Sequence, residues 1–222
     1  FVASSLVSMY GKCGNLQQAE ILFVSAWSQS QGCPHDTVLV VWNAMLSAYV
    51  EQGQAQKALA LYRRIMEDGT SPDQLTLLLA VKACAVLAEK GNGFIWEVSS
   101  TSNKLSPGLA IHMEAEVKGF TSDVALSNTL INMYGKCGNL AHAIVIFDRM
   151  ASRNILSWTS MISVCEQSDR GKTAFFYFRE MEQEGMMPSK YAFVSMLASC
   201  ATDGALAIGK QIHTLVHIDG LD

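Results

Sequence analysis

Residues 6–16 read LVSMYGKCGNL, and residues 130–140 read LINMYGKCGNL. Nine of the eleven positions are identical, and the match continues as far as Phe23 and Phe147. Chance does not produce a match of this length, so the chain contains an internal repeat. A repeat fixes the architecture, because each copy is one structural unit that buries its apolar face only against its neighbours.

Two further blocks follow each copy in the same order. The block WNAMLS at residues 42–47 returns as WTSMIS at residues 158–163, and the Gly-x-x-Pro element at residues 69–72 returns at residues 185–188. In both pairs the two copies are separated by the same number of residues, whereas the two copies of the opening match lie further apart in the sequence. The first copy therefore carries insertions.

We place these insertions near Ser25–Cys33 and near Ala88–Lys104. The second stretch contains polar residues together with several glycines and serines. That composition is typical of a surface loop. Such a loop departs from the pattern of the repeat and can disturb the stacking of neighbouring units.

Residues 124–154 show how one repeat folds. Apolar residues at helical spacing predict a first helix that includes Leu126–Tyr134. Gly138 suits the left-handed turn that ends a helix, and Asn139 is a good N-cap for the next one. A second amphipathic helix then includes Ala143–Met150. The sequence thus predicts an all-α fold, a right-handed α-solenoid of helix-turn-helix hairpins with one concave side.

The amino-acid composition limits the class of protein to which the chain can belong. Half of the 222 residues are hydrophobic, 16% are charged, and the formal net charge is −4. The charge excludes a basic nucleic-acid-binding tail and bulk attraction to an anionic membrane. No apolar run is long enough to span a bilayer, and no signal or transit peptide is visible. Residues 1–4 already belong to a repeat, so we expect the chain to be part of a longer protein.

The six cysteines form no Cys-x-x-Cys pair. Cys13 and Cys137 share one repeat position, and Cys84 and Cys200 share another. Packing of a small buried thiol explains a position that recurs with the repeat. We therefore expect free structural cysteines in a reducing compartment, and no metal site.

One short pattern suggests catalysis. His112-Met113-Glu114 matches the first half of a zinc deaminase signature, a His two residues before a catalytic Glu. The Cys-x-x-Cys half is missing, and His112 aligns with His213, which no Glu follows at that spacing. The histidine therefore belongs to the repeat. We expect no catalytic residue, no cofactor, no small-molecule substrate and no enzyme activity in this chain.

The repeated blocks resemble pentatricopeptide repeats, of the plant PLS class that alternates long, short and standard motifs. The resemblance is carried by MYGKCGNL at residues 9–16 and 133–140 for the short type, by VWNAM at 41–45 and SWTSM at 157–161 for the standard type, and by GKQIH at 209–213, with a weaker GLAIH at 108–112, for the long type. It covers essentially the whole chain. It implies a single array over residues 1–222 with units at 1–38 (short, with an insert), 39–73 (standard), 74–123 (long, with an insert), 124–154 (short), 155–189 (standard) and 190–222 (long, incomplete).

The resemblance implies binding of single-stranded RNA at about one base per repeat. In this family one polar side chain early in the first helix and the last residue of the same motif read the base. An Asn amide offers a donor and an acceptor to a pyrimidine, whereas a smaller hydroxyl leaves room for a purine. The residues carried over are Ser4 (nominally with Val38), Asn43 with Asp73 for uridine, Asn128 with Asn154 for a pyrimidine, cytidine more than uridine, and Thr159 with Ser189 for a purine.

Further roles follow from the same resemblance. The long motifs place Leu78 and Val194 at the base-reading position, where neither can hydrogen-bond a base, so these motifs act as spacers. The expected preference is 5′-purine–U–any–pyrimidine–purine–any-3′. The residues expected to sandwich bases are Val40, Ala125 and Leu156, and those expected to contact phosphate are Lys12 and Lys136.

The resemblance also implies a role and a location. The array would position an organellar transcript for RNA modification or processing, with C-to-U editing favoured and catalysis outside this chain. A deaminase or other editing factors are the implied protein partners, and the mitochondrion or chloroplast of a plant is the implied compartment.

The alternative is a protein-binding helical scaffold of the tetratricopeptide type. Such an array keeps a period of about 34 residues and has none of these polar pairs. A nuclease fragment would need an acidic metal-binding cluster, which the sequence lacks.

Overall fold

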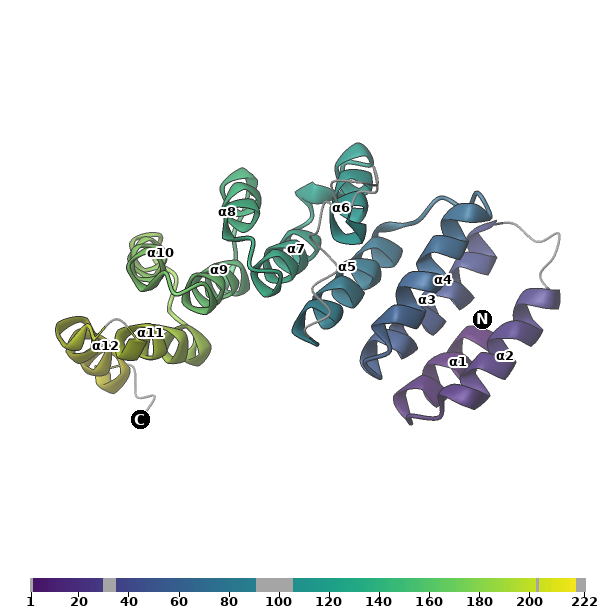
Figure 1. Cartoon of the computed structure of the whole chain (residues 1–222), viewed down its shortest axis with the longest axis horizontal. Helices are drawn as coiled ribbons and strands as arrows, with labels where there is room; N and C mark the ends of the chain where they lie inside the picture. The colour runs from purple at the N-terminus through teal and green to yellow at the C-terminus, as the bar shows by residue number, and fades with distance from the viewer. Residues whose placement is uncertain (1, 30–34, 91–105, 203, 219–222) are drawn as a thin grey trace, which may run out of the picture. The chain divides into compact units, whose positions relative to one another are not determined.

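The computed structural model describes residues 2–29, 35–90, 106–202 and 204–218 (Figure 1). Throughout these residues the regular structure is helical, so the predicted all-α fold of helical hairpins is confirmed. The twelve α-helices are α1 (Val2–Lys12), α2 (Leu16–Gln29), α3 (His35–Glu51), α4 (Ala55–Glu67), α5 (Gln74–Glu89), α6 (Pro107–Val117), α7 (Val124–Lys136), α8 (Leu140–Arg149), α9 (Ile155–Gln167), α10 (Gly171–Gln183), α11 (Lys190–Thr202) and α12 (Leu206–Ile218). A 3-10 turn, η2, covers Phe120–Ser122.

The helices group into two compact units, Phe1–Phe120 and Thr121–Asp222. In the first unit α1 pairs with α2, α3 with α4 and α5 with α6, while α3 packs against both α1 and α5. In the second unit α7 pairs with α8, α9 with α10 and α11 with α12, while α9 packs against both α7 and α11. Five of the six hairpins fall within one expected motif each, whereas α3 begins at His35, inside the motif expected at residues 1–38. That the two units form one continuous array stays a prediction.

The turns between helices are those that the glycines predict. Gly138 has a φ of 71° directly after α7, and the side chain of Asn139 accepts a hydrogen bond from the backbone N–H of His142 at the start of α8. Gly69 and Gly185 have φ values of 72° and 73° after α4 and α10. A left-handed residue just after a helix lets the chain reverse and satisfies the last carbonyls of the helix.

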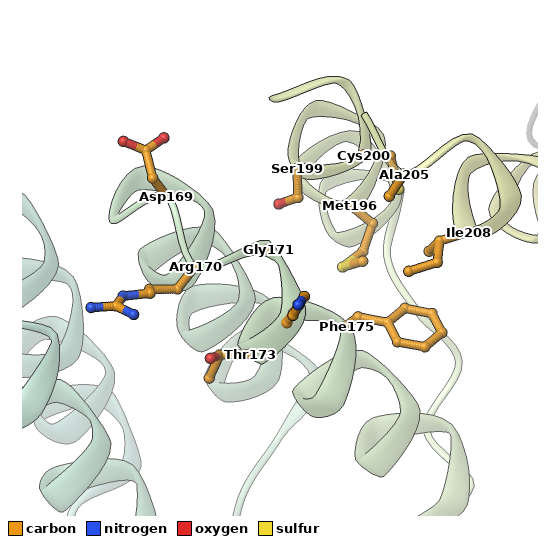
Figure 2. Close-up of a pocket in the computed structure, with 11 residues that line it drawn as sticks. Asp169, Arg170, Gly171, Thr173, Phe175, Met196, Ser199, Cys200, Ala205 and Ile208 are labelled. Carbon is orange, nitrogen blue, oxygen red and sulfur yellow. The ribbon is translucent and has the colours of Figure 1, made fainter. Parts of the chain in front are cut away.

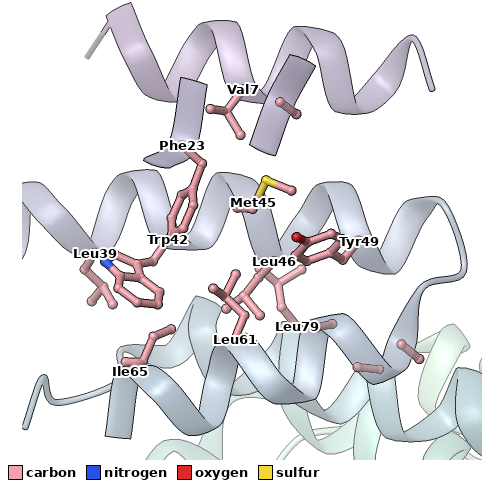
Figure 3. Close-up of a cluster of buried hydrophobic side chains, with 14 residues drawn as sticks. Val7, Phe23, Leu39, Trp42, Met45, Leu46, Tyr49, Leu61, Ile65 and Leu79 are labelled. Carbon is pink, nitrogen blue, oxygen red and sulfur yellow. The ribbon is translucent and has the colours of Figure 1, made fainter. Parts of the chain in front are cut away.

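The core of the first unit is shared by successive hairpins (Figure 3). Val7 of α1 and Phe23 of α2 lie against α3, where Trp42 meets Phe23 edge to face with ring centroids 5.2 Å apart. The second unit repeats this pair, because Phe147 meets Trp158 edge to face at 4.8 Å. A hairpin cannot bury both apolar faces alone, so each first helix is held between two neighbours.

The first insertion is partly helical. Helix α2 continues to Gln29, and α3 begins at His35, ahead of the expected motif start at residue 39. Trp27, inside the inserted stretch, lies edge-on to Trp42 at 5.5 Å, and the guanidinium of Arg64 stacks on its ring at 3.9 Å. The described part of this insertion therefore extends the hairpin and packs on its core. Most of the second insertion, at residues 91–105, lies outside the described residues.

Two glycines allow close helix packing. A Cβ built on Gly135 of α7 would lie 2.3 Å from Cγ2 of Val164 on α9, and a Cβ on Gly11 of α1 would lie 2.5 Å from Cβ of Ala48 on α3. No side chain fits at either position without a shift. The glycine of the repeated Tyr-Gly-Lys sequence thus sets how closely successive first helices approach. The sequence analysis assigned it no role.

The five cysteines in the described residues form no disulfide. Cys84 is buried, as expected, but Cys13 is exposed and Cys137 is only partly buried. The packing explanation is therefore wrong for Cys13, because its position follows the end of α1 and faces solvent. Cys165 is buried in α9, and burial raises the pKa of its thiol to about 12.

Candidate nucleic-acid interface

The first predicted base-reading pair is in direct contact. Asn43 lies in α3, and Asp73 is the N-cap residue of α5, whose side chain accepts a hydrogen bond from the backbone N–H of Thr76 at 2.7 Å. The Nδ2 atom of Asn43 donates to Oδ1 and Oδ2 of Asp73 at 3.1 and 3.2 Å. The structure therefore brings together two side chains 30 residues apart in the sequence.

The second pair meets in the same way. Nδ2 of Asn128, in α7, lies 3.4 Å from Oδ1 of Asn154. Asn154 is the N-cap residue of α9 and forms a capping box with Ser157. Asn128 is only 5% exposed, and its Oδ1 is buried without a hydrogen-bond partner among the described residues. A buried acceptor without a partner is costly.

The third pair consists of two hydroxyls. Oγ1 of Thr159 and Oγ of Ser189 lie 3.1 Å apart. Thr159 donates its single hydrogen to the backbone carbonyl of Ile155 at 2.7 Å, so Ser189 is the donor between the two hydroxyls. Oγ of Ser189 also accepts from the backbone N–H of Ala192 at the start of α11.

One local rule explains the three contacts. Asp73, Asn154 and Ser189 each precede the first helix of the next motif and hydrogen-bond the backbone N–H three residues later. Asp, Asn and Ser are favoured N-caps, so the residue types that cap a helix are also those that the predicted base-reading role requires. Because successive first helices pack side by side, each cap lies beside the preceding motif. The sequence analysis missed the capping role, although a polar residue before an apolar run signals it.

The first unit contains an open groove of about 740 Å³ between α1, α3 and the start of α5. Because neighbouring first helices contribute to one wall, the groove is continuous from one motif to the next. Five predicted residues line it: Ser4, Lys12, Val40, Asn43 and Asp73.

The nominal partner of Ser4 occupies a different kind of position. Val38 lies inside α3, past the helix start at His35, and packs against the hydrophobic core of the first unit. Asp73, Asn154 and Ser189 instead stand before their helices. The insertion moves the beginning of α3, so counting along the repeat does not find the capping position here.

The predicted sandwiching residues are exposed apolar side chains. Val40 is 44% exposed, Leu156 is 59% exposed, and Ala125 is also exposed. Each lies three residues before Asn43, Thr159 or Asn128 on the same helix, and residues three apart share one helix face. The face that carries each polar pair thus also carries an apolar side chain.

The predicted phosphate contacts occupy equivalent places. Lys12 and Lys136 lie in the last turns of α1 and α7. Lys12 is exposed at the groove of the first unit, whereas Lys136 is partly buried. In the long motifs, Leu78 is partly buried and Val194 is 64% exposed.

A cavity of about 530 Å³ lies elsewhere in the second unit, between the α9–α10 turn and α11–α12 (Figure 2). Phe175, Met196 and Ile208 line its apolar side. The charged residues of its lining are Asp169, Arg170 and Lys172. None of the predicted base-reading residues lines this cavity.

The partial deaminase pattern forms no metal site in the described residues. His112 is buried, and its Nε2 lies 3.7 Å from Oε1 of Glu116, while Glu114 lies 3.6 Å from Nζ of Lys118. No cluster of three His, Cys, Asp or Glu side chains suited to a metal ion occurs anywhere in the described ranges. None of the helices described is long and apolar enough to cross a membrane.

Comparison with known families decides the classification. The PPR repeat family matches residues 38–86, and the PPR repeat matches residues 1–25, 126–155 and 156–186. The chain belongs to the PPR repeat family. The matched segments contain all three first-helix residues of the contacting pairs, and they follow the helical hairpins of the structure.

Two Arabidopsis thaliana relatives show the same family along the chain. The mitochondrial pentatricopeptide repeat-containing protein At3g02330 is 33% identical over 220 residues, which cover 99% of this chain and 22% of that protein. The chloroplastic At1g11290 is 32% identical over 222 residues, which cover 100% of this chain and 25% of that protein. The chain thus spans about a quarter of the length of these PPR relatives.

Solved structures agree on the fold. The crystal structure of the pentatricopeptide repeat protein PPR10 from maize matches with a TM-score of 0.67 at 18% identity, over 98% of this chain and 29% of PPR10. A structure of PPR10 in complex with an 18-nt psaJ RNA element matches with a TM-score of 0.52 at 15% identity, over 98% of this chain and 35% of PPR10.

Proposed function

We propose that this PPR chain binds single-stranded RNA and reads about one base per motif. The contact within three of the four predicted pairs supports the proposal, because in each a first-helix side chain meets the residue that caps the next first helix, on the face that carries an exposed apolar residue. That arrangement can hydrogen-bond a base edge while the apolar side chain packs on the base. The complex of PPR10 with an RNA element shows that a protein of the same fold binds RNA.

The base assigned to each motif follows from the chemistry of its pair. Asn43 and Asp73 combine an amide with an acceptor-only carboxylate, which we assign to uridine. Asn128 and Asn154 are two amides, which we assign to a pyrimidine. Thr159 and Ser189 are two short hydroxyls that leave room for a purine. With Ser4 at the first motif and spacers at the long motifs, the proposed preference is 5′-purine–U–any–pyrimidine–purine–any-3′.

The affinity of this chain is expected to be modest. Contacts to phosphate supply much of the binding energy of most nucleic-acid complexes, and the formal net charge here is −4. Lys12 and Lys136 are the proposed phosphate contacts. The last turn of a helix stabilises a cation there in any case, so the RNA uses charges that the fold already favours.

We further propose that the array belongs to the PLS class and positions an organellar transcript for C-to-U editing. The alternation of long, short and standard motifs supports this class, and relatives in mitochondria and chloroplasts support an organellar location. Catalysis would then come from a deaminase or other editing factors outside residues 1–222. Pull-down of a deaminase from organelle extracts by the full-length protein, dependent on the target RNA, is the direct test of this role.

Selection from a random RNA pool tests base reading. Chain 1–222 should enrich single-stranded RNAs that contain uridine, a pyrimidine and a purine in the proposed order and spacing. A variant with Asn43, Asn128 and Thr159 all changed to Ala should lose that enrichment. Gln17→Ala with Gln56→Ala, both exposed on second helices, is the control and should keep it. Enrichment of unrelated sequences by the unmodified chain would refute the assignment.

A further inference from the structure

A third side chain contacts the first base-reading pair, and the family resemblance implied no role for it. Thr76 lies in the first turn of α5 and is fully buried. Its Oγ1 lies 2.8 Å from Oδ1 of Asn43 and 2.7 Å from Oδ1 of Asp73. The hydroxyl therefore touches both members of the pair, from the motif that follows them in the sequence.

The Thr76 hydroxyl has two acceptors within reach, Oδ1 of Asn43 and Oδ1 of Asp73. The Asp73 carboxylate already accepts hydrogen bonds from the backbone N–H of Thr76 and from Nδ2 of Asn43. The Thr76 hydroxyl has one hydrogen, and when it donates to Oδ1 of Asn43, every polar atom of the cluster has a partner. If the Asn43 amide turned over, its oxygen would face the Asp73 carboxylate and the hydrogen bonds from Nδ2 to Asp73 would be lost.

We propose that Thr76 is a specificity-determining residue that, together with Asp73, holds the Asn43 amide in one orientation by donating to its oxygen. This inference rests on the proposed reading of RNA bases by the Asn43–Asp73 pair. The orientation matters because the two pyrimidines present opposite patterns. Uridine offers an acceptor at O4 beside a donor at N3, whereas cytidine offers a donor at N4 beside an acceptor at N3. One fixed amide complements one of the two patterns, and the reversed amide complements the other.

The second pair provides an internal comparison. Ser157 stands at the position equivalent to Thr76, and its hydroxyl lies 3.0 Å from Oδ1 of Asn154 and accepts from the backbone N–H of Asn154. Oδ1 of Asn128, however, has no partner among the described residues. The cap of α9 holds Oδ1 of Asn154 toward Nδ2 of Asn128, so Asn154 is the one orienting contact of Asn128 among the described residues, whereas Asn43 has two. We infer that motif 39–73 distinguishes uridine from cytidine more sharply than motif 124–154 does.

Thr76 acts through Asn43, so its test must measure selectivity and not affinity alone. Chain 1–222 is titrated with two single-stranded RNAs that carry the proposed sequence and differ only at the nucleotide of motif 39–73, uridine in one and cytidine in the other. The readout is the ratio of the two dissociation constants. Loss of one orienting hydrogen bond should lower this ratio by roughly three- to tenfold in Thr76→Val. Thr76→Ser keeps the hydroxyl and should keep the ratio.

Two further variants separate orientation from folding. Thr76→Ala removes the same hydroxyl and leaves more space beside Asn43. If Thr76→Val packs poorly there, the ratio is measured in whichever of the two variants has the higher melting temperature. Ser157→Ala removes the equivalent buried hydroxyl in the second unit and should leave the ratio at the uridine unchanged. A general loosening of the fold would weaken binding of both RNAs alike and would not change the ratio.

The outcomes separate the two proposals. A reduced ratio in the hydroxyl-free variant, with the ratio retained by Thr76→Ser, supports the role of Thr76. If the unmodified chain prefers uridine and the hydroxyl-free variant prefers it equally, the role of Thr76 is wrong while base reading by Asn43 and Asp73 stands. If the unmodified chain does not distinguish the two RNAs, the proposed reading fails, and the inference about Thr76 fails with it.

Discussion

Asn43 in the first helix of motif 39–73 contacts Asp73, the last residue of the same motif, with Nδ2 of Asn43 3.1 and 3.2 Å from the two carboxylate oxygens of Asp73. Asp73 caps α5 at the same time. The residue that starts one hairpin thus completes the polar pair of the hairpin before it. Specificity and stacking consequently depend on the same helix boundary.

Replacing Asn43 by Thr should change the preferred base. The shorter hydroxyl leaves room for a purine, and the Asp73 carboxylate can accept hydrogen bonds from the N1–H and N2–H groups of guanine. With Asp73 retained, we expect the preference at this nucleotide to move from uridine toward guanosine. Selection of bound RNAs from a random pool measures it, and an unchanged uridine would contradict the assignment of Asn43.

Replacing Asn154 by Asp should make motif 124–154 more selective for uridine over cytidine. A carboxylate caps α9 as well as the amide does, so we expect a change in stability within about 0.5 kcal/mol. The carboxylate only accepts hydrogen bonds, so it should bind Nδ2 of Asn128, which already faces position 154, more strongly and reproduce the Asn43–Asp73 arrangement. The preference should then move from either pyrimidine toward uridine by several-fold, measured by titration with paired RNAs. Asn154→Ala is the comparison, because it should lower stability by about 1 kcal/mol through loss of the cap.

The repeat sequence predicts the local structure well, because each motif contains its own helix signals. Gly138 and Asn139 indicate the turn between α7 and α8, and both have the predicted conformations. The apolar spacing likewise indicates which helix faces are buried. These features depend on neighbouring residues, so periodicity is enough to find them.

Contacts between motifs are harder to predict. Nothing in the spacing shows that Thr76 reaches back to Asn43, because that contact depends on how closely α3 and α5 pack. The stacking of Arg64 on Trp27 depends on an insertion that the repeat pattern does not describe. The same insertion places Val38 inside α3, where counting from the motif end expected a base-reading partner.

Gly135 should tolerate no side chain while Val164 is present. A Cβ there would lie 2.3 and 3.0 Å from the two methyl carbons of Val164. We expect Gly135→Ala to destabilise the second unit by about 1–2 kcal/mol, because the cost of overpacking exceeds the gain from the better helix former. Adding Val164→Ala should recover much of this loss, and a double-mutant cycle from urea unfolding measures the coupling.

Gly138 provides the control for this cycle. A Cβ at Gly138 meets nothing within 4 Å, but its φ of 71° disfavours any other residue. Gly138→Ala should therefore cost about 1 kcal/mol through backbone strain. Val164→Ala should not relieve that cost, because the strain is local to the turn. Equal coupling of Val164 to both glycines would show that contact with α9 is not the cause.

Ionisation of the Tyr177 phenol should lower the stability of the chain in alkaline solution. Burial in the core of the second unit, with a smaller effect of the Asp148 carboxylate, raises the pKa of the Tyr177 phenol from its usual value of 10.0 to about 12. The folded chain thus holds this proton more tightly than the unfolded chain does. The contribution is complete below about pH 10 and is lost as the pH rises through about 12, and it amounts to about 2–3 kcal/mol.

Tyr177→Phe should reduce this dependence, because no phenolate then forms between the rings of Phe147 and Trp158. Urea unfolding followed by circular dichroism between about pH 8 and pH 12 gives the slope of stability against pH. Tyr191, which is 65% exposed on α11, is the matched control, because its ring stays in water on folding and Tyr191→Phe should leave the slope unchanged. Burial also raises the pKa of the neighbouring Cys165 thiol to about 12. Cys165→Ala removes that thiol and so measures its share of the slope. A slope that survives in Tyr177→Phe combined with Cys165→Ala would show that the alkaline loss arises from other groups, such as Tyr62 of the first unit, where burial also raises the pKa to about 12.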